Sequence, residues 1–169
     1  EESIITGILS RLPNIEELSL AQSGSVVTDS VVKAICNRYP LVRKLDLEQC
    51  VNLTGQSLNY IKELENLTEL NLSKISQLGD EDLSILSKGC PKLEFLKLSY
   101  GGFTSVGFEH LNNITTLKEL EYPFTEKNLE ATQKYITDHP NVQVRADPIL
   151  FDFKTSSGTW YPAVVATFS

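Results

Sequence analysis

One apolar pattern recurs along this chain at nearly constant intervals, and it limits the folds that the chain can adopt. The pattern is L-x-x-L-x-L with conservative replacements. Its five copies begin at Ile15, Val42, Leu67, Leu93 and Leu117, which are separated by 27, 25, 26 and 24 residues. Such regular spacing predicts an array of structural repeats in which each unit contacts its neighbours.

Each copy predicts one short β-strand followed by one helix. The last two apolar residues of a copy, such as Leu45 and Leu47, are two apart, so both face the same side of a strand. A second apolar set follows with three-residue spacing, which indicates a helix. Its members are Val31, Val32 and Ile35, then Leu58 and Ile61, then Leu83 and Leu86, and finally Phe108 and Leu111. The expected unit runs strand, loop, helix, turn.

Capping and stop residues mark the ends of the expected helices. Each helix should begin near a residue whose side-chain oxygen can accept hydrogen bonds from free amide groups. These residues are Thr28-Asp29, Thr54, Asp80, Thr104 and Thr125. Pro40, Pro91 and Pro140 cannot extend a preceding helix, and each stands two residues before the next first apolar position.

Stacking of these units predicts an α/β solenoid. A single unit cannot cover its own apolar side, so the strands should form a parallel sheet on the concave side of a horseshoe arc. The helices are expected on the convex side, with right-handed crossovers. We interpret residues 1–14 as the last helix of a preceding repeat or an N-terminal cap, and residues 15–141 as five repeats.

Residues 142–169 are interpreted as a degenerate terminal strand and a β-hairpin-like cap or tail. Val142 follows Pro140 on schedule, but Arg145 stands where the second apolar residue is expected. The later residues are β-rich in composition around a Ser-Ser-Gly turn, which favours a hairpin. These later residues have three interpretations. They are a cap over the exposed end of the core, a partner-binding segment or the beginning of another domain.

The units resemble the cysteine-containing leucine-rich repeats of F-box substrate receptors and related proteins. The best match is YPLVRKLDLEQC and the residues after it, over 39–58, followed by residues 89–98. The resemblance covers about residues 12–141. It implies a leucine-rich-repeat fold, a structural turn role for Cys50, and a place as the substrate-recognition part of a ubiquitin-ligase-type assembly.

The other repeats do not share the cysteine. They carry Ser23, Ile75 and Gly101 at the place of Cys50. A metal site or catalytic site built from this position in several units is therefore excluded. A buried, small apolar side chain is the expected role of Cys50.

Residues between the buried strand positions should face the concave surface, where solenoids contact their ligands. The expected columns are Glu17, Lys44, Glu69, Phe95 and Glu119; then Ser19, Asp46, Asn71, Lys97 and Glu121; then Ala21, Glu48, Ser73, Ser99 and Pro123. The candidate partner-binding residues are Glu17, Ser19, Lys44, Asp46, Glu48, Glu69, Asn71, Phe95, Lys97, Tyr100, Glu119 and Glu121.

Four aromatic residues predict a binding hot spot toward the far end of this surface. They are Phe95, Tyr100, Phe103 and Phe124. The alternative is that Phe103 packs in the core of its loop and that Phe95 is merely tolerated at its position.

The motifs point to a binding module that is not an enzyme. The sequence has no metal-ligand spacing, phosphate-cradling glycine loop or nucleophile motif, so we expect no catalytic residues, no metal and no cofactor. The expected partner is a protein or peptide, and the alternative is a structural or regulatory subunit that docks through its helices or tail. A net charge of −7 argues against nucleic acid, and no apolar stretch is long enough to span a membrane.

The compartment has two interpretations. Three cysteines are an odd and sparse set, which favours a reducing cytoplasm or nucleus. Asn52, Asn66, Asn71 and Asn113 fit the N-glycosylation pattern, which makes secretion the alternative. Because the chain contains no methionine, we expect that it was cut from a longer polypeptide, and an F-box would have to lie in a preceding portion.

Overall fold

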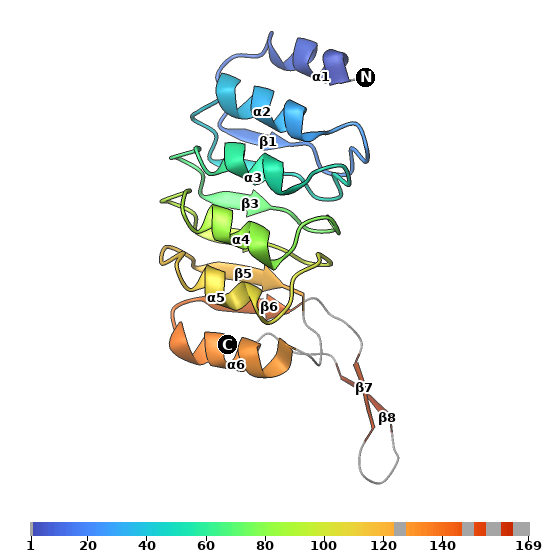
Figure 1. The fold of residues 1–169 in the computed structure, drawn as a ribbon, viewed down its shortest axis with the longest axis vertical. Helices are drawn as coiled ribbons and strands as arrows, with labels where there is room; N and C mark the ends of the chain where they lie inside the picture. Colours follow the sequence, from blue (N-terminus) through green and yellow to red (C-terminus); the bar gives the residue numbers. More distant parts are fainter. Residues whose placement is uncertain (1, 124–127, 147–150, 155–159, 164–169) are drawn as a thin grey trace.

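The computed structural model describes residues 2–123, 128–146, 151–154 and 160–163, and it has the predicted solenoid architecture (Figure 1). Within these residues, six parallel strands form one sheet in chain order: β1 (Glu17–Ser19), β2 (Lys44–Asp46), β3 (Glu69–Asn71), β4 (Phe95–Lys97), β5 (Glu119–Tyr122) and β6 (Gln143–Ala146). The other layer holds α1 (Glu2–Leu9), α2 (Asp29–Arg38), α3 (Gly55–Ile61), α4 (Asp80–Leu86), α5 (Gly107–Leu111) and α6 (Leu129–Asp138).

The predicted apolar positions form the core between these two layers. The central residues of successive strands are register partners, namely Leu18, Leu45, Leu70, Leu96, Leu120 and Val144. From Leu45 onward each of them is at most 4% exposed. The predicted helix positions are buried as well, with Ile35, Ile61 and Leu86 at most 1% exposed. Each unit therefore supplies one layer of a continuous core.

Strand β6 departs from the sequence prediction by one residue. Val144 is the register partner of Leu120 and is buried, whereas Arg145 is the partner of Glu121 and is exposed. Arg145 therefore does not take the second apolar place. Because side chains alternate along a strand, a one-residue shift moves the arginine from the core side to the opposite face of the sheet.

The N-caps of α2 and α3 are the expected residues Thr28 and Thr54, whereas the N-cap of α4 is Gly79 and Asp80 is the first residue of that helix. Thr54 is the N-cap of α3, where its hydroxyl accepts a hydrogen bond from the Gln56 N–H at 3.2 Å. The next-to-last helix, α5, begins at Gly107, three residues after Thr104. Thr125, the start expected for the last helix, lies outside the described residues, and α6 begins at Leu129.

Pairs of Asp and Thr join consecutive units near the helix starts. The carboxylate of Asp29 accepts hydrogen bonds from the Thr54 N–H at 3.0 Å and from its hydroxyl at 2.7 Å. Asp80 accepts the same two bonds from Thr104, at 2.8 Å and 2.5 Å. Each Asp lies in the first turn of a helix, where a negative charge also complements the helix dipole. These contacts tie the loop of one unit to the helix of the unit before it.

The C-terminal residues that the structure describes form a separate two-stranded sheet. Strands β7 (Phe151–Lys154) and β8 (Trp160–Ala163) pair antiparallel with each other. The Ser-Ser-Gly turn expected between them lies outside the described residues.

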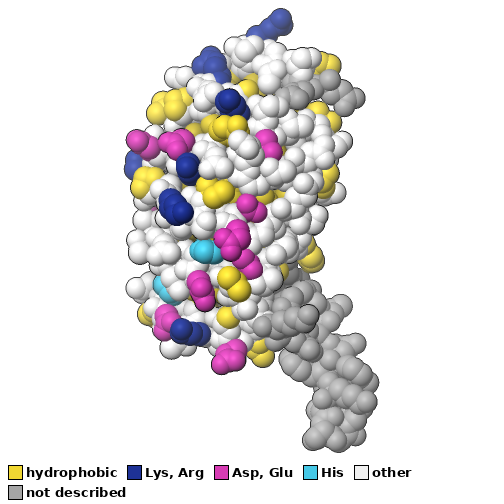
Figure 2. Space-filling model, viewed as in Figure 1, with side chains coloured by type: hydrophobic (Ala, Val, Ile, Leu, Met, Phe, Trp, Pro, Cys, Tyr) yellow, Lys and Arg dark blue, Asp and Glu magenta, His cyan; other side chains and the backbone are white. Residues whose placement is uncertain are grey.

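The side of the molecule that carries the helices has a mixed surface. Figure 2 views this side and shows Lys and Arg side chains interspersed with Asp and Glu and with small apolar areas. On α2, for example, Lys33, Asn37 and Arg38 are exposed. Across the described residues, no helix has both the length and the apolar character needed to cross a membrane.

The Asp29 contact predicts a measurable loss of stability on substitution. Asp29→Ala leaves the Thr54 N–H and hydroxyl without their acceptor, and hydrogen bonds to a charged group contribute about 1.5 to 3 kcal/mol. We expect the free energy of unfolding in urea to fall by about this amount. The exposed Glu65→Ala is the control and should leave the midpoint unchanged; equal midpoints for both variants would show that the Asp29 contact is not stabilising.

Candidate functional site

Two straight rows of side chains cover the open face of the parallel sheet, which we call the concave face. Register partners on successive strands form the first row, Glu17, Lys44, Glu69, Phe95, Glu119 and Gln143, and the second row, Ser19, Asp46, Asn71, Lys97, Glu121 and Arg145. The structure thus brings together the ten residues expected in the first two columns. Sequence reasoning missed Gln143 and Arg145, because it placed Arg145 on the core side.

The third expected column lies at the edge of the concave face and is largely buried. Ser73 and Ser99 are 5% and 4% exposed, and Pro123 is buried. Glu48, one of the partner-binding candidates, is half-buried and forms an ion pair with Lys74. Glu48, Ser73 and Ser99 nevertheless line a smaller pocket of about 140 Å³ beside second-row residues, so a binding role for Glu48 stays a prediction.

Side-chain contacts at the strand ends explain this difference. Oδ1 of Asp46 accepts a hydrogen bond from the Glu48 N–H at 3.0 Å, and Oδ1 of Asn71 accepts one from the Ser73 N–H at 3.0 Å. Asp and Asn form such turns with the backbone two residues ahead. The turn ends the strand after the second row, so the next residue no longer follows the strand alternation.

A left-handed residue follows the turn in each of the first four units. The residues are Gln22, Gln49, Lys74 and Tyr100, with φ between 56° and 62°. Side chains other than glycine disfavour this conformation. The N–H groups of the first three offset the cost by donating to carbonyls of the next unit at 2.7 to 2.9 Å. In the fourth unit, Tyr100 is 55% exposed while Ser99 before it is buried.

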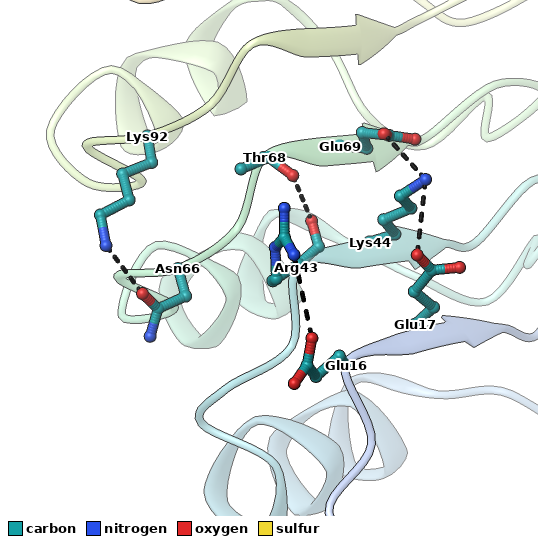
Figure 3. Close-up of polar contacts among 8 residues, drawn as sticks. All are labelled: Glu16, Glu17, Arg43, Lys44, Asn66, Thr68, Glu69 and Lys92. Atoms are coloured by element: carbon teal, nitrogen blue, oxygen red, sulfur yellow. Dashed lines mark hydrogen bonds and ion pairs between the residues drawn. The ribbon is translucent and has the colours of Figure 1, made fainter.

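Ion pairs between neighbouring strands hold the rows in place. In the first row, Nζ of Lys44 lies 3.5 Å from Oε1 of Glu17 and 3.1 Å from Oε1 of Glu69 (Figure 3). The hydrogen bond with Glu69 raises the pKa of Lys44, and the negative charges of Glu17 and Glu69 raise it further. Because exposed pairs contribute little to stability, their main effect is to orient these side chains.

The far end of the face has two more pairs. Nζ of Lys97 lies 2.8 Å from Oε1 of Glu121, and Nε of Arg145 lies 3.3 Å from Oε1 of Glu119. The pKa of Lys97 is raised, chiefly by its hydrogen bond with Glu121. Both cations are therefore committed to carboxylates on β5.

An open groove of about 450 Å³ runs along the concave face over β1 to β4. Its rim is formed by the row residues of these four strands, and Leu18, Leu45 and Leu70 lie beneath them. Phe95 is half-buried within it and is the aromatic side chain of its lining. The groove thus combines charged groups of both signs with one aromatic ring.

The four predicted aromatic residues do not form one exposed patch. Phe103 is 4% exposed and packs against Tyr122, with ring centroids 6.2 Å apart, so it belongs to the core. A Cβ atom at Gly101 would lie 2.4 Å from the Phe103 ring, which explains the glycine in this repeat. Phe95 and Tyr100 remain accessible, and Phe124 lies outside the described residues.

Cys50 is a buried residue at the end of its strand. It is 0% exposed, and its Sγ donates a hydrogen bond to the Leu20 carbonyl at 3.2 Å. Burial raises the pKa of Cys50 to about 11 and the pKa of both Cys36 and Cys90 to about 12. Because the thiolate is the nucleophile and the metal ligand, these buried, protonated thiols are suited to packing and not to chemistry at neutral pH.

Comparison with known sequences finds three relatives, among them a mouse protein that matches part of the chain. No family model matches the chain. Over 96 residues, 54% of the chain, it is 35% identical to lysine-specific demethylase 2B of Mus musculus. The match spans 7% of the length of that protein.

Solved structures share the architecture. Actin-binding site 2 of leiomodin-1 aligns with a TM-score of 0.59 and 13% identity, over 83% of this chain and 87% of that one. The leucine-rich-repeat domain of Mex67 from Chaetomium thermophilum aligns with a TM-score of 0.55 and 18% identity, over 79% and 99%. Identities this low bear on the fold and not on the partner. The chain has a leucine-rich-repeat solenoid fold.

The buried thiols predict how stability depends on alkaline pH. An unfolded thiol has a pKa of 9.0 and a folded Cys36 or Cys90 about 12, so above pH 9 the folded state holds more protons. Stability is then full below pH 9 and falls as the pH rises, by about 1 kcal/mol for each thiol at pH 10. Urea denaturation at pH 8 and pH 10 measures this fall.

Cys36→Ala provides the comparison for this prediction. The variant lacks one of the titrating thiols, so its loss of stability between the two pH values should be smaller than that of the original chain. Identical losses would mean that the Cys36 thiol is not protected from ionisation by burial.

Proposed function

We propose that this chain is a non-catalytic binding module that engages a protein partner through its concave face. The groove over β1 to β4 carries this proposal. Ion pairs to neighbouring strands keep its rim side chains in fixed positions, and Phe95 offers an apolar contact between them. An open surface that combines one aromatic anchor with oriented polar side chains suits recognition of another protein.

The chemistry of the groove supports binding over catalysis. Its ionisable side chains are Glu17, Asp46 and Glu69 with Lys44 and Lys97. The pKa values of both lysines are raised, so they are charged at neutral pH and cannot act as bases or nucleophiles. The groove therefore has charges for recognition, and neither of its lysines is activated.

The charge pattern also favours a protein partner over nucleic acid. Lys44, Lys74, Lys97 and Arg145 each form an ion pair with a carboxylate on or beside the concave face. A phosphate backbone would have to compete with these carboxylates for every cation. The net charge of −7 acts in the same direction.

We further propose that the module is the substrate-recognition part of a ubiquitin-ligase-type assembly. This finer role rests on the resemblance of residues 39–58 and 89–98 to the cysteine-containing repeats of F-box substrate receptors. Affinity purification of the native protein, followed by mass spectrometry, tests it. Recovery of ubiquitin-ligase subunits supports the role, and recovery of other stable partners without them contradicts it.

A steric block tests the concave face whatever the chemistry of the partner. Ser19→Trp places a bulky ring in the second row at the groove, so we expect affinity for the native partner to fall about tenfold or more. Asn37→Trp, on the exposed side of α2, is the matched control and should bind normally. The reverse pattern would assign binding to the helices.

Apolar side chains are accessible at the N-terminal end of the solenoid, which makes this end a second candidate docking surface. Ile4 and Ile8, one helical turn apart on α1, are 62% and 57% exposed. Leu18 and Leu20 of the first unit are half-buried, although the equivalent Leu45 is 2% exposed. We therefore propose that residues 1–14 are the last helix of a preceding repeat. The rest of that repeat would cover this end of the core.

Two leucine substitutions measure whether this end is covered. In the 169-residue chain, Leu45→Ala should cost about 2 to 5 kcal/mol of unfolding free energy, and Leu18→Ala clearly less, because its site is already open to solvent. In a polypeptide extended toward its N-terminus, the cost of Leu18→Ala should approach that of Leu45→Ala. An unchanged difference would favour an N-terminal cap instead.

A further inference from the structure

We propose that the groove on the concave face accepts a basic side chain of the partner, an arginine in preference to a lysine, stacked on the ring of Phe95 between Glu69 and Glu119. This inference rests on the proposed function and adds the chemistry of the partner to it. It concerns one position in the groove and leaves the rest of the partner open.

The sheet register places a carboxylate on each side of the ring. Phe95 on β4 is the register partner of Glu69 on β3 and of Glu119 on β5. Neighbouring strands lie about 4.8 Å apart and the three side chains rise from the same face, so a guanidinium on the ring would share Glu69 with Lys44 and Glu119 with Arg145. The face of an aromatic ring attracts a cation, and a planar guanidinium can stack on it while bonding to a carboxylate.

The charges around the groove leave an excess of carboxylates. Among the described residues of the concave face and its edge, six carboxylates stand against four cations: Glu17, Asp46, Glu48, Glu69, Glu119 and Glu121 against Lys44, Lys74, Lys97 and Arg145. Lys44 is shared by two carboxylates, and Asp46 is bonded to the uncharged donors Ser19 Oγ and Glu48 N–H.

This excess lies on the Glu69 side of the Phe95 ring, whereas Glu119 on the other side is compensated by Arg145. Glu17, Asp46 and Glu69 belong to β1 to β3, and all three line the groove together with Phe95. A cation from the partner would relieve the mutual repulsion of these carboxylates, whereas a carboxylate from the partner would increase it. Charge complementarity therefore selects a basic occupant.

Lys97 is the positive group that faces this site from the same strand. It lies two residues after Phe95 and so points to the same face. Its ammonium is held 2.8 Å from Glu121 on β5, which compensates its charge and keeps it in the second row. Lys97→Gln removes a positive charge from the groove and should therefore strengthen binding of a basic peptide.

Selection from a random peptide library displayed on phage tests the inference with a defined probe. The biotinylated 169-residue chain is the bait, and each selected peptide is afterwards tested for binding to Ser19→Trp. We expect the selected peptides to be enriched in arginine. A synthetic copy of one of them should bind about tenfold more weakly when its arginine is replaced by the neutral isostere citrulline, and about threefold more weakly with lysine.

Variants of the chain test whether the arginine of the selected peptide binds at Phe95. Phe95→Leu keeps an apolar side chain but removes the ring, and we expect the selected peptide to bind about fivefold more weakly. Glu69→Gln should weaken binding by a similar factor. Glu94→Gln is the matched control, because it removes the same charge from a carboxylate that pairs with Lys118 outside the groove.

The outcomes separate this inference from the proposed function. Peptides that Ser19→Trp rejects but that carry no basic residue, or that bind equally well with citrulline, overturn the basic-side-chain site and leave the concave face as the binding surface. A selection whose peptides all bind Ser19→Trp as well as the original chain overturns both. Equal effects of Glu69→Gln and Glu94→Gln would also overturn the site, because they indicate a response to net charge.

Discussion

Parallel pairing between the strands of successive units is the interaction on which the rest of this structure depends. It sets Leu45, Leu70 and Leu96 in register, so that one continuous core is built from units that cannot bury their own apolar side. The Asp29 to Thr54 contact and the hydrogen bonds of the left-handed residues repeat the same link in the loops. Every unit is thus stabilised by its neighbours. Strand β1 has a neighbouring strand on one side only, and its Leu18 remains half-buried.

The same register builds the concave face. Lys44 meets Glu17 and Glu69 because the three are register partners, although 27 and 25 residues separate them in the chain. Since the strands are short and end in turns formed by Asp46 and Asn71, the face is limited to two rows. The charges of the groove are oriented by ion pairs across strands.

Much of the fold could be predicted from the chain, and less of the site. The strand alternation places Phe95 and Lys97 on one face whatever their neighbours are. It could not show that Ser99 turns inward. The next residue, Tyr100, has a left-handed backbone conformation, and because it is not a glycine the sequence gives no sign of this. Phe103 was ambiguous for a similar reason: an aromatic residue in a loop is apolar in either setting, and its packing against Tyr122 decides. The register of β6 was missed because Val142 and Val144 both suit a buried place.

The sequence by itself determined the repeated unit, the order of its strand and helix, and the residue types available to the concave face. These are local properties, because periods of two and of about 3.6 residues are visible within one unit. The tertiary structure decided which charges meet, which aromatic rings stay accessible and where the excess of carboxylates lies. Those depend on contacts between residues about 25 positions apart, and a shift of one residue in a turn, as before Arg145, changes the face to which a side chain points.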